Sequence, residues 1–206
     1  MGTKRAEQAL KTRQKILKCF TKLAAKKTFD DLSVEDITSS CGVAKGTFYT
    51  YFKRKEDIVF EVCREPFAEI QKKLSGMKNK SIQEKLTCYF GLFMYEVERY
   101  GVNICREWIR GVIDPATAPK NMDNQKWQYD TDMLREILND AIKNGELKDN
   151  TPVDLLVHLI ISQLYGMMTC WCMSDTEFEP KDWVKPFCEV QLQKILKDFV
   201  RKEKKK

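Results

Sequence analysis

The sequence has few of the residues on which catalytic and metal sites depend. Its 206 residues include one histidine, His158, and its eight cysteines form no Cys-x-x-Cys pair. The nine glycines form no phosphate-binding loop. His158 is therefore the one histidine that could act as a general acid or base. A mixed Cys/His metal site would need cysteines that are distant in the sequence to come together. We therefore expect no enzyme, no metal site and no cofactor, although the Cys170-x-Cys172 pair leaves a redox or metal role open.

Long hydrophobic runs are also missing. The most apolar stretch, 155–168, is interrupted by His158, Ser162 and Gln163 and is too short for a convincing membrane span. No apolar segment near the N-terminus resembles a signal peptide. We expect a cytoplasmic protein that does not enter a membrane and whose thiols are reduced and mostly buried.

The sequence shows no alternating strand pattern, no internal repeat and no Gly/Ser linker. Apolar residues instead recur at the i, i+3, i+4, i+7 spacing of amphipathic helices. The pattern predicts an all-α fold of about nine helices. We expect them at 9–27, at a short segment opening on Ser33, at 45–52, from Lys55 with a break near Pro66, and at 82–97, 102–111, 127–144, 151–173 and 186–201. The stretch 114–124 is expected to be a loop.

The positive charge of the chain is unevenly distributed. Residues 1–60 contain 13 Lys and Arg against 7 Asp and Glu, whereas 61–206 contain 23 of each kind. The whole excess of +6 therefore lies in the N-terminal part. Such a basic region attracts phosphate groups without regard to base sequence.

Residues 33–52 have the pattern of a helix-turn-helix. Ser33 is a good N-cap, and Asp36 stands three residues later, where a capping acid belongs. Gly42 lies in the turn 41–44, at a left-handed position that glycine tolerates best. The second helix, 45–52, is about two turns long and rich in polar and aromatic side chains. In this motif the second helix enters the major groove of DNA.

The stretch resembles the tetracycline-repressor (TetR) family of transcriptional regulators. The residues that match the family pattern are Ser33, Val34, Ile37, Thr38, Cys41, Gly42, Val43, Ala44, Gly46, Tyr49, Tyr51, Phe52 and Lys55. Ala44 stands where serine is usual, so one cap of the second helix is lost. The resemblance covers about the first third of the chain, and beyond it only the length and the helical pattern agree.

The resemblance implies two domains. A three-helix DNA-binding domain would occupy residues 1–55, and a helical domain for effector binding and dimerisation would occupy 56–206. Tyr49, Tyr51 and Lys55 resemble family positions that hold phosphates. The full set of expected DNA-binding residues is Ser33, Lys45, Gly46, Thr47, Tyr49, Thr50, Tyr51 and Lys55.

Within that set the expected roles differ. Lys45 and Thr47 follow the turn, near the helix end that meets base edges. Gly46 removes a side chain, so that the backbone can approach the groove. Ser33 and Thr50 are expected to add contacts to the DNA backbone, which fix register without reading sequence.

In the second domain, aromatic and sulfur-containing residues are expected either to form a core or to line an effector pocket, as the resemblance implies. The candidate pocket residues are Tyr89, Phe93, Cys105, Trp108, Trp127, His158, Gln163 and Tyr165. The last two helices have wide apolar surfaces, and in the resembling family they form the dimer interface. The candidate interface residues are Leu156, Ile160, Leu164, Met167, Leu192, Ile195 and Phe199.

These features predict a homodimeric transcriptional regulator of double-stranded DNA. We expect a repressor that binds a near-palindromic operator and is released by a small-molecule effector. Two other hypotheses remain at this point: a helix-turn-helix regulator controlled by a protein partner, and a helical carrier or enzyme.

Overall fold

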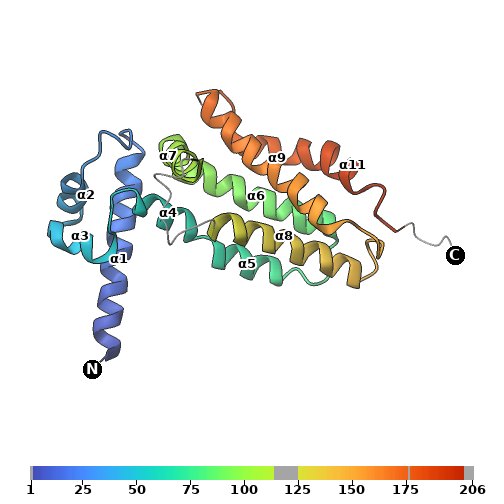
Figure 1. Cartoon of the computed structure of the whole chain (residues 1–206), viewed down its shortest axis with the longest axis horizontal. Helices are drawn as coiled ribbons and strands as arrows, with labels where there is room; N and C mark the ends of the chain where they lie inside the picture. The colour runs from blue at the N-terminus through green and yellow to red at the C-terminus, as the bar shows by residue number, and fades with distance from the viewer. Residues whose placement is uncertain (1, 114–124, 176, 202–206) are drawn as a thin grey trace. The chain divides into compact units, whose positions relative to one another are not determined.

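The computed structural model describes residues 2–113, 125–175 and 177–201 (Figure 1). The described part is helical and contains no strand, only one isolated bridge between Leu147 and Val200. The predicted all-α fold is confirmed. The expected loop at 114–124 and the end of the basic tail lie outside the described residues.

The chain divides into two compact units. The head unit contains the described residues up to Glu65 and those from Tyr100 to Ile113, and the body unit contains the rest. The helices of the head unit are α1 (Gly2–Ala24), α2 (Val34–Cys41), α3 (Lys45–Tyr51), α4 (Asp57–Arg64) and α7 (Val102–Ile113). Those of the body unit are α5 (Phe67–Ser75), α6 (Ile82–Tyr100), α8 (Gln125–Lys143), α9 (Val153–Met173), α10 (Pro180–Phe187), the π-helical η1 (Cys188–Leu192) and α11 (Gln193–Leu196).

Among the described residues the helices number nine, as predicted, when α4 and α5 are counted as the one predicted helix that breaks near Pro66 and the continuous run of α10, η1 and α11 is counted as one. Proline at position 66 lacks an N–H and clashes with the preceding turn, so the helix stops at Arg64 and restarts at Phe67.

The core of the head unit forms where α1 packs against α2, α4 and α7. Ile16, Leu17 and Phe20 lie on one face of α1 and are fully buried, as their spacing predicted. The Phe20 ring meets the Phe29 ring edge-on, with centroids 6.2 Å apart. The loop after α1 is thereby anchored to α1.

In the body unit, α8 packs mainly against α9. A capping box precedes α6: the Glu84 amide donates to Ser81 Oγ at 3.3 Å, and the Ser81 amide donates to Glu84 Oε2 at 2.9 Å. Gly145 ends α8 with a left-handed φ of 79°. Helix α9 begins two residues later than the expected 151, at Val153 after Pro152, and Thr151 donates its hydroxyl to Lys148 O.

The last helix begins earlier than predicted, at Pro180 rather than near Pro186. Pro180 occupies the first helical position, where a missing N–H has no intrahelical partner to lose. Pro186 lies inside the helix, and the π-helical stretch η1 begins two residues later. A wider turn is one way for a helix to continue past a disturbed hydrogen-bond ladder.

Helix α9 is the one helix among the described residues that is long and apolar enough to cross a membrane. Half of its most apolar window is buried inside the protein. Core helices of globular proteins pass the same test of length and composition, and α9 packs as such a helix here.

The packing units and the predicted functional domains are divided at different places. The resemblance implies a division between DNA binding and effector binding after residue 55, and this functional division stays a prediction. By packing, α4 lies with the head unit, and so does α7, which comes much later in the sequence.

Candidate nucleic-acid interface

The helix-turn-helix is built by local hydrogen bonds that the sequence specifies. The Asp36 amide donates to Ser33 Oγ at 3.0 Å, and the Ser33 amide donates to Asp36 Oδ2 at 2.9 Å. Gly42 ends α2 in the left-handed region, with φ 62°, and its N–H donates to the last carbonyls of the helix. Both predictions about this motif are confirmed. The sharp turn sets the direction in which α3 starts.

Helix α3 has one buried and one exposed face. Phe48 is completely buried, and its ring lies 5.1 Å from that of Phe52, so these two side chains hold α3 to the head unit. The N-terminus of α3 has no side-chain cap at Ala44, as predicted. The predicted contact residues Lys45, Gly46, Tyr49 and Thr50 are exposed, whereas Thr47 and Tyr51 are half-buried.

The exposed end of α3 carries an ion pair. The Lys45 ammonium pairs with the Glu35 carboxylate of α2, and both side chains are more than half exposed. The Lys45 hydrogen bond lowers the pKa of Glu35, and the same bond raises the pKa of Lys45. A phosphate approaching Lys45 must therefore compete with Glu35 for the ammonium.

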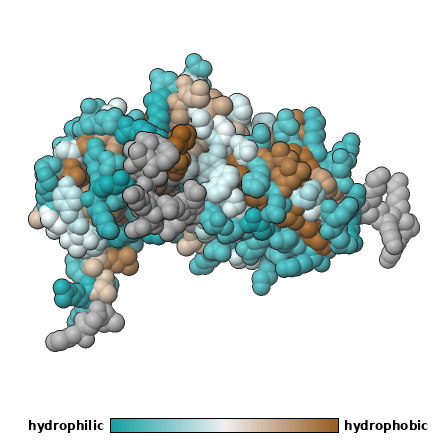
Figure 2. All heavy atoms as spheres, viewed as in Figure 1, coloured by the Kyte–Doolittle hydropathy of each residue, from teal (hydrophilic) through white to brown (hydrophobic). Residues whose placement is uncertain are grey.

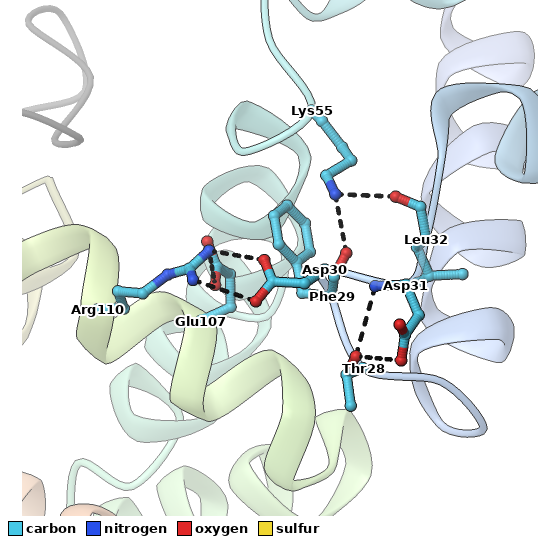
Figure 3. Close-up of polar contacts among 8 residues, drawn as sticks. All are labelled: Thr28, Phe29, Asp30, Asp31, Leu32, Lys55, Glu107 and Arg110. Atoms are coloured by element: carbon cyan, nitrogen blue, oxygen red, sulfur yellow. Dashed lines mark hydrogen bonds and ion pairs between the residues drawn. The ribbon is translucent and has the colours of Figure 1, made fainter.

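Lys55 has a structural position that the sequence did not indicate (Figure 3). Its ammonium donates to the carbonyls of Phe29 and Leu32, each at 2.8 Å, and lies 4.1 Å from the centroid of the Phe29 ring. These contacts use two of its three N–H donors. Lys55 thus holds the loop before α2, and the predicted phosphate contact stays untested.

We expect Lys55→Met to lower the free energy of unfolding of the head unit by about 2–3 kcal/mol. The substitution keeps a long apolar stem but leaves two partly buried carbonyls without their charged donor. Urea unfolding followed by far-UV circular dichroism measures this loss. The neighbouring Lys53 is exposed, so Lys53→Met is the control and should change stability by less than about 0.5 kcal/mol. Equal losses in the two variants would contradict the structural role of Lys55.

Helix α7 holds the other side of the same loop. The Asn103 amide donates to Ala24 O at 3.0 Å and Lys27 O at 3.1 Å, at the end of α1. Arg110 pairs with Asp30 at 3.3 Å and with Glu107 at 2.8 Å (Figure 3). Burial raises the pKa of Glu107 against the opposing effect of Arg110, and the hydrogen bond to Glu107 raises the pKa of Arg110. The loop that leads into the helix-turn-helix is therefore bound by Lys55, in the segment between α3 and α4, and by residues of α7.

The predicted pocket residues do not all come together in one unit. Cys105 and Trp108 lie on α7 and are buried within the head unit, and their place in an effector pocket stays a prediction. The amphipathic pattern of α7 shows which side is apolar but not which unit that side packs against. Gln163 is exposed on α9.

Five of the predicted pocket residues do cluster in the body unit. The Tyr165 ring lies 5.7 Å from Phe93 and 5.7 Å from Trp127, and Trp127 stacks on His158 at 6.4 Å. Tyr89 is buried beneath them and joins Tyr165 through a shared carboxylate. Trp127 is 37% exposed, so the aromatic cluster reaches the surface.

The shared carboxylate is Asp130, which the sequence alone does not single out. It is 1% exposed, accepts hydrogen bonds from Tyr89 at 2.7 Å and Tyr165 at 2.6 Å, and pairs with Lys126 at 2.5 Å. Burial, followed by the charge of Asp130, raises the pKa of Tyr89 well above its usual value. Its spacing in the sequence could have identified Asp130 as an inward-facing residue. Asp130 stands three residues after Trp127 and four before Leu134, on the inward face of α8.

Most of the residues predicted for the dimer interface lie in the core of the chain, and the interface itself stays a prediction. Leu156, Ile160, Leu164, Met167 and Leu192 are buried within their own chain, and Ile195 and Phe199 are half-buried. The outward apolar residues of these helices are different ones. They are Leu155, Leu159, Met173, Trp183 and Val190.

The cysteines are free thiols among the described residues. Cys170 is exposed while Cys172 is buried, so the two residues of the Cys-x-Cys pair lie in different surroundings. Within the described part of the chain, no cluster of His, Cys, Asp and Glu is arranged to hold a metal ion. Burial is the main cause that raises the pKa of Cys41, at the end of α2, to about 12.

Comparison with known proteins agrees with this geometry. Residues 16–62 match the family model described as bacterial regulatory proteins, tetR family. The fatty acid metabolism regulator protein of Bacillus subtilis (strain 168) is 24% identical over 169 residues, which make up 80% of this chain and 85% of that protein.

Two solved structures show the same fold. The fatty acid degradation regulator FadR from Bacillus halodurans matches with a TM-score of 0.71 and 21% identity, covering 86% of this chain and 96% of that one. FadR from Bacillus subtilis, in complex with stearoyl-CoA, matches with a TM-score of 0.70 and 22% identity over the same shares of the two chains.

Proposed function

Because the chain belongs to the tetR family of bacterial regulatory proteins, we propose that it is a cytoplasmic transcriptional repressor rather than an enzyme. It binds a near-palindromic operator as a homodimer and leaves the DNA when a small molecule binds the body unit. The observation that carries the proposal is the exposed polar face of α3, set on a rigid core in the part of the chain that holds all the excess positive charge. That arrangement suits the major groove.

The contacts are divided between bases and phosphates. Lys45 and Thr47 contact base edges, and Gly46 allows the backbone to approach. Ser33, Tyr49, Thr50 and Tyr51 contact phosphates, and Lys55 acts near them by holding the loop before α2. Tyr49 supports this assignment, because it is 48% exposed although its aromatic ring would be more stable in a core.

Selection of bound sites from random duplex DNA tests the function. We expect an inverted repeat whose half-sites are separated by about one helical turn, ~34–36 Å. A band-shift titration of the selected site against scrambled competitor then measures specificity. If the purified protein binds both equally, the repressor proposal fails.

We expect Tyr49→Phe to weaken binding to the selected operator and to scrambled DNA by the same factor, about 3- to 10-fold. The substitution removes one hydrogen bond to a phosphate, worth about 1 kcal/mol, and phosphates carry no base information. The ring and its packing stay the same, so circular dichroism should be unchanged. The control Thr47→Ala should instead reduce the preference for the operator over scrambled DNA. A loss of preference in Tyr49→Phe would contradict the phosphate assignment.

The effector we propose is a fatty acyl compound of the stearoyl-CoA type. Two observations support it: the relatives are named for fatty acid metabolism, and one was solved with stearoyl-CoA. The aromatic cluster around Tyr165 offers apolar surface in the body unit. The effector must bind the DNA-free conformation more tightly than the DNA-bound one, because a ligand that binds both conformations equally well does not change their relative populations.

Adding stearoyl-CoA to the operator complex tests this step. We expect release of the DNA at micromolar concentrations, with a shorter acyl-CoA acting more weakly. If stearoyl-CoA binds but leaves operator affinity unchanged, the switch is not a fatty acyl compound. Release by a protein from the same cell instead would support the second hypothesis, control by a protein partner.

The dimer we propose uses the outward face of α9 and the last helix. Leu155 is 57% exposed, Leu159 44% and Val190 50%, and Figure 2 shows apolar surface over the part of the body unit where α9 runs. Exposed apolar residues gathered on one face are typical of subunit contacts. Sedimentation velocity should show a dimer at micromolar concentration, and a monomer there would contradict the model of paired half-sites.

A further inference from the structure

The body unit contains a small cavity that none of the roles above uses. It has a volume of about 60 Å³ and lies between α5, α6 and α8. Its lining residues are Leu74, Ser75, Lys78, Lys85, Met133, Glu136, Ile137 and Asp140. None of the eight residues predicted for the effector pocket is among them. The cavity is therefore a site separate from the aromatic cluster.

The floor of the cavity carries a buried lysine. Lys85 is only 6% exposed. Within the described residues its ammonium has no hydrogen-bond or ion-pair partner. No sealed side-chain nitrogen or oxygen in the described part lacks a partner, so this ammonium is not sealed from solvent, and the Lys85 side chain lines the cavity. An unpaired buried charge is costly unless a counter-ion or water meets it.

The other lining residues restrict what can meet Lys85. Leu74, Met133 and Ile137 are buried and make the walls apolar. At the rim, Lys78 and Glu136 are exposed, and Asp140 lies 3.9 Å from the ammonium of Lys143. Acids at the rim repel a dianion more strongly than a monoanion. Apolar walls favour an alkyl group, and the small volume admits only a short one.

We infer that this cavity binds a short-chain alkyl monocarboxylate, whose carboxylate pairs with Lys85 and whose alkyl group contacts Leu74, Met133 and Ile137. The site goes beyond the proposed repressor function and does not depend on it. A ligand that binds only the folded body also stabilises it by mass action.

Butyrate is the probe for this site. Protein labelled with ¹³C at the methionine methyl groups reports on the cavity through Met133, whose resonance is assigned with Met133→Leu. Butyrate, butyramide, butylammonium and phosphate are titrated at constant ionic strength. We expect butyrate alone to shift the Met133 resonance along a saturating curve, because only butyrate combines a single negative charge with an alkyl group.

Lys85→Met removes the charge and keeps the length of the side chain, and replacing an unpaired buried ion by an apolar group seldom unfolds a protein. This variant should weaken butyrate binding at least tenfold, while Lys78→Met at the rim changes it less than threefold. An equal shift with butyramide would overturn the role of the charge, and an equal shift with phosphate would overturn the carboxylate. Unchanged binding in Lys85→Met, or no shift with any probe, would overturn the site itself.

The comparison of butyrate with butyramide uses the unmodified protein, so the inference stays testable even if Lys85→Met does not fold. Operator binding is measured in a separate experiment. A protein that binds DNA but not butyrate would refute the cavity proposal alone.

Discussion

Asp130→Ala should lower the free energy of unfolding of the body unit by about 3–5 kcal/mol, the loss expected when one partner of a buried ion pair is removed. Asp130 is almost completely buried, and three donors from three helices converge on it: Tyr89 of α6, Lys126 of α8 and Tyr165 of α9. Without the carboxylate, the Lys126 ammonium and two tyrosine hydroxyls lose their acceptor in a region of low dielectric.

The surroundings of Lys126 make the loss large. Its side chain is only 16% exposed and lies 4.2 Å from the centroid of the Phe93 ring. The ring attracts a cation but does not replace a carboxylate. Urea unfolding followed by tryptophan fluorescence measures the change, because Trp127 and Trp171 belong to the body unit.

Asp132→Ala is the matched control, two residues along the same helix. The Asp132 side chain is 58% exposed and pairs with Arg135 at 2.8 Å on the surface. Exposed ion pairs contribute little, so this variant should lose less than about 1 kcal/mol. A loss below 1 kcal/mol in Asp130→Ala would show that the buried network contributes no more than a surface pair.

Phe48→Ala should lower the free energy of unfolding of the head unit by about 3–5 kcal/mol and abolish DNA binding with it. The side chain is completely buried and packs on Phe52 at 5.1 Å, within a helix of only seven residues. So short a helix is unstable alone and depends on tertiary packing. Removing the ring leaves a cavity beneath α3 that the small core cannot readily fill.

The control for Phe48→Ala is Thr50→Ala, on the exposed face of α3. The Thr50 hydroxyl donates to Gly46 O at 3.1 Å within the helix, so its loss should change stability by less than about 0.5 kcal/mol. Circular dichroism with urea and band shift on the selected operator are measured on both variants. Phe48→Ala with unchanged stability and unchanged DNA affinity would contradict the view that the buried face of α3 supports its exposed face.

Local features of the helix-turn-helix were predictable because the residues that form them are near one another in the sequence. The Ser33–Asp36 capping box and the left-handed Gly42 each involve a few consecutive residues. The same holds for the Ser81–Glu84 box. The Pro66 break follows from one residue whose backbone chemistry is always the same.

The site residues were harder to predict because their surroundings are assembled from distant segments. Lys55 meets carbonyls 26 and 23 residues earlier in the chain. Cys105 and Trp108 belong to the head unit because α7 packs there, about 40 residues after α4 ends. Helical periodicity identifies an apolar face but does not say which neighbour will cover it.

Within helix α9 alone, one property follows from the sequence and another depends on tertiary packing. Its composition is apolar on nearly every side, so the sequence indicated a surface wider than one core contact. Packing against the neighbouring helices then buries Leu156 and Ile160 and leaves Leu155 and Leu159 exposed. A rotation of about 100° per residue separates neighbouring positions on a helix, and only the positions of the neighbouring helices select between them.

By itself, the sequence determined the all-α class, the helix-turn-helix with its caps, and the match of its N-terminal part to the tetR family model. Short-range hydrogen bonding and backbone preferences specify these features within a few residues. Only the tertiary structure decided that Lys55 and Arg110 hold the loop before α2, that Asp130 joins three helices, and that Lys85 faces a cavity. Those roles depend on which side chains lose contact with water together, and that is settled by long-range packing.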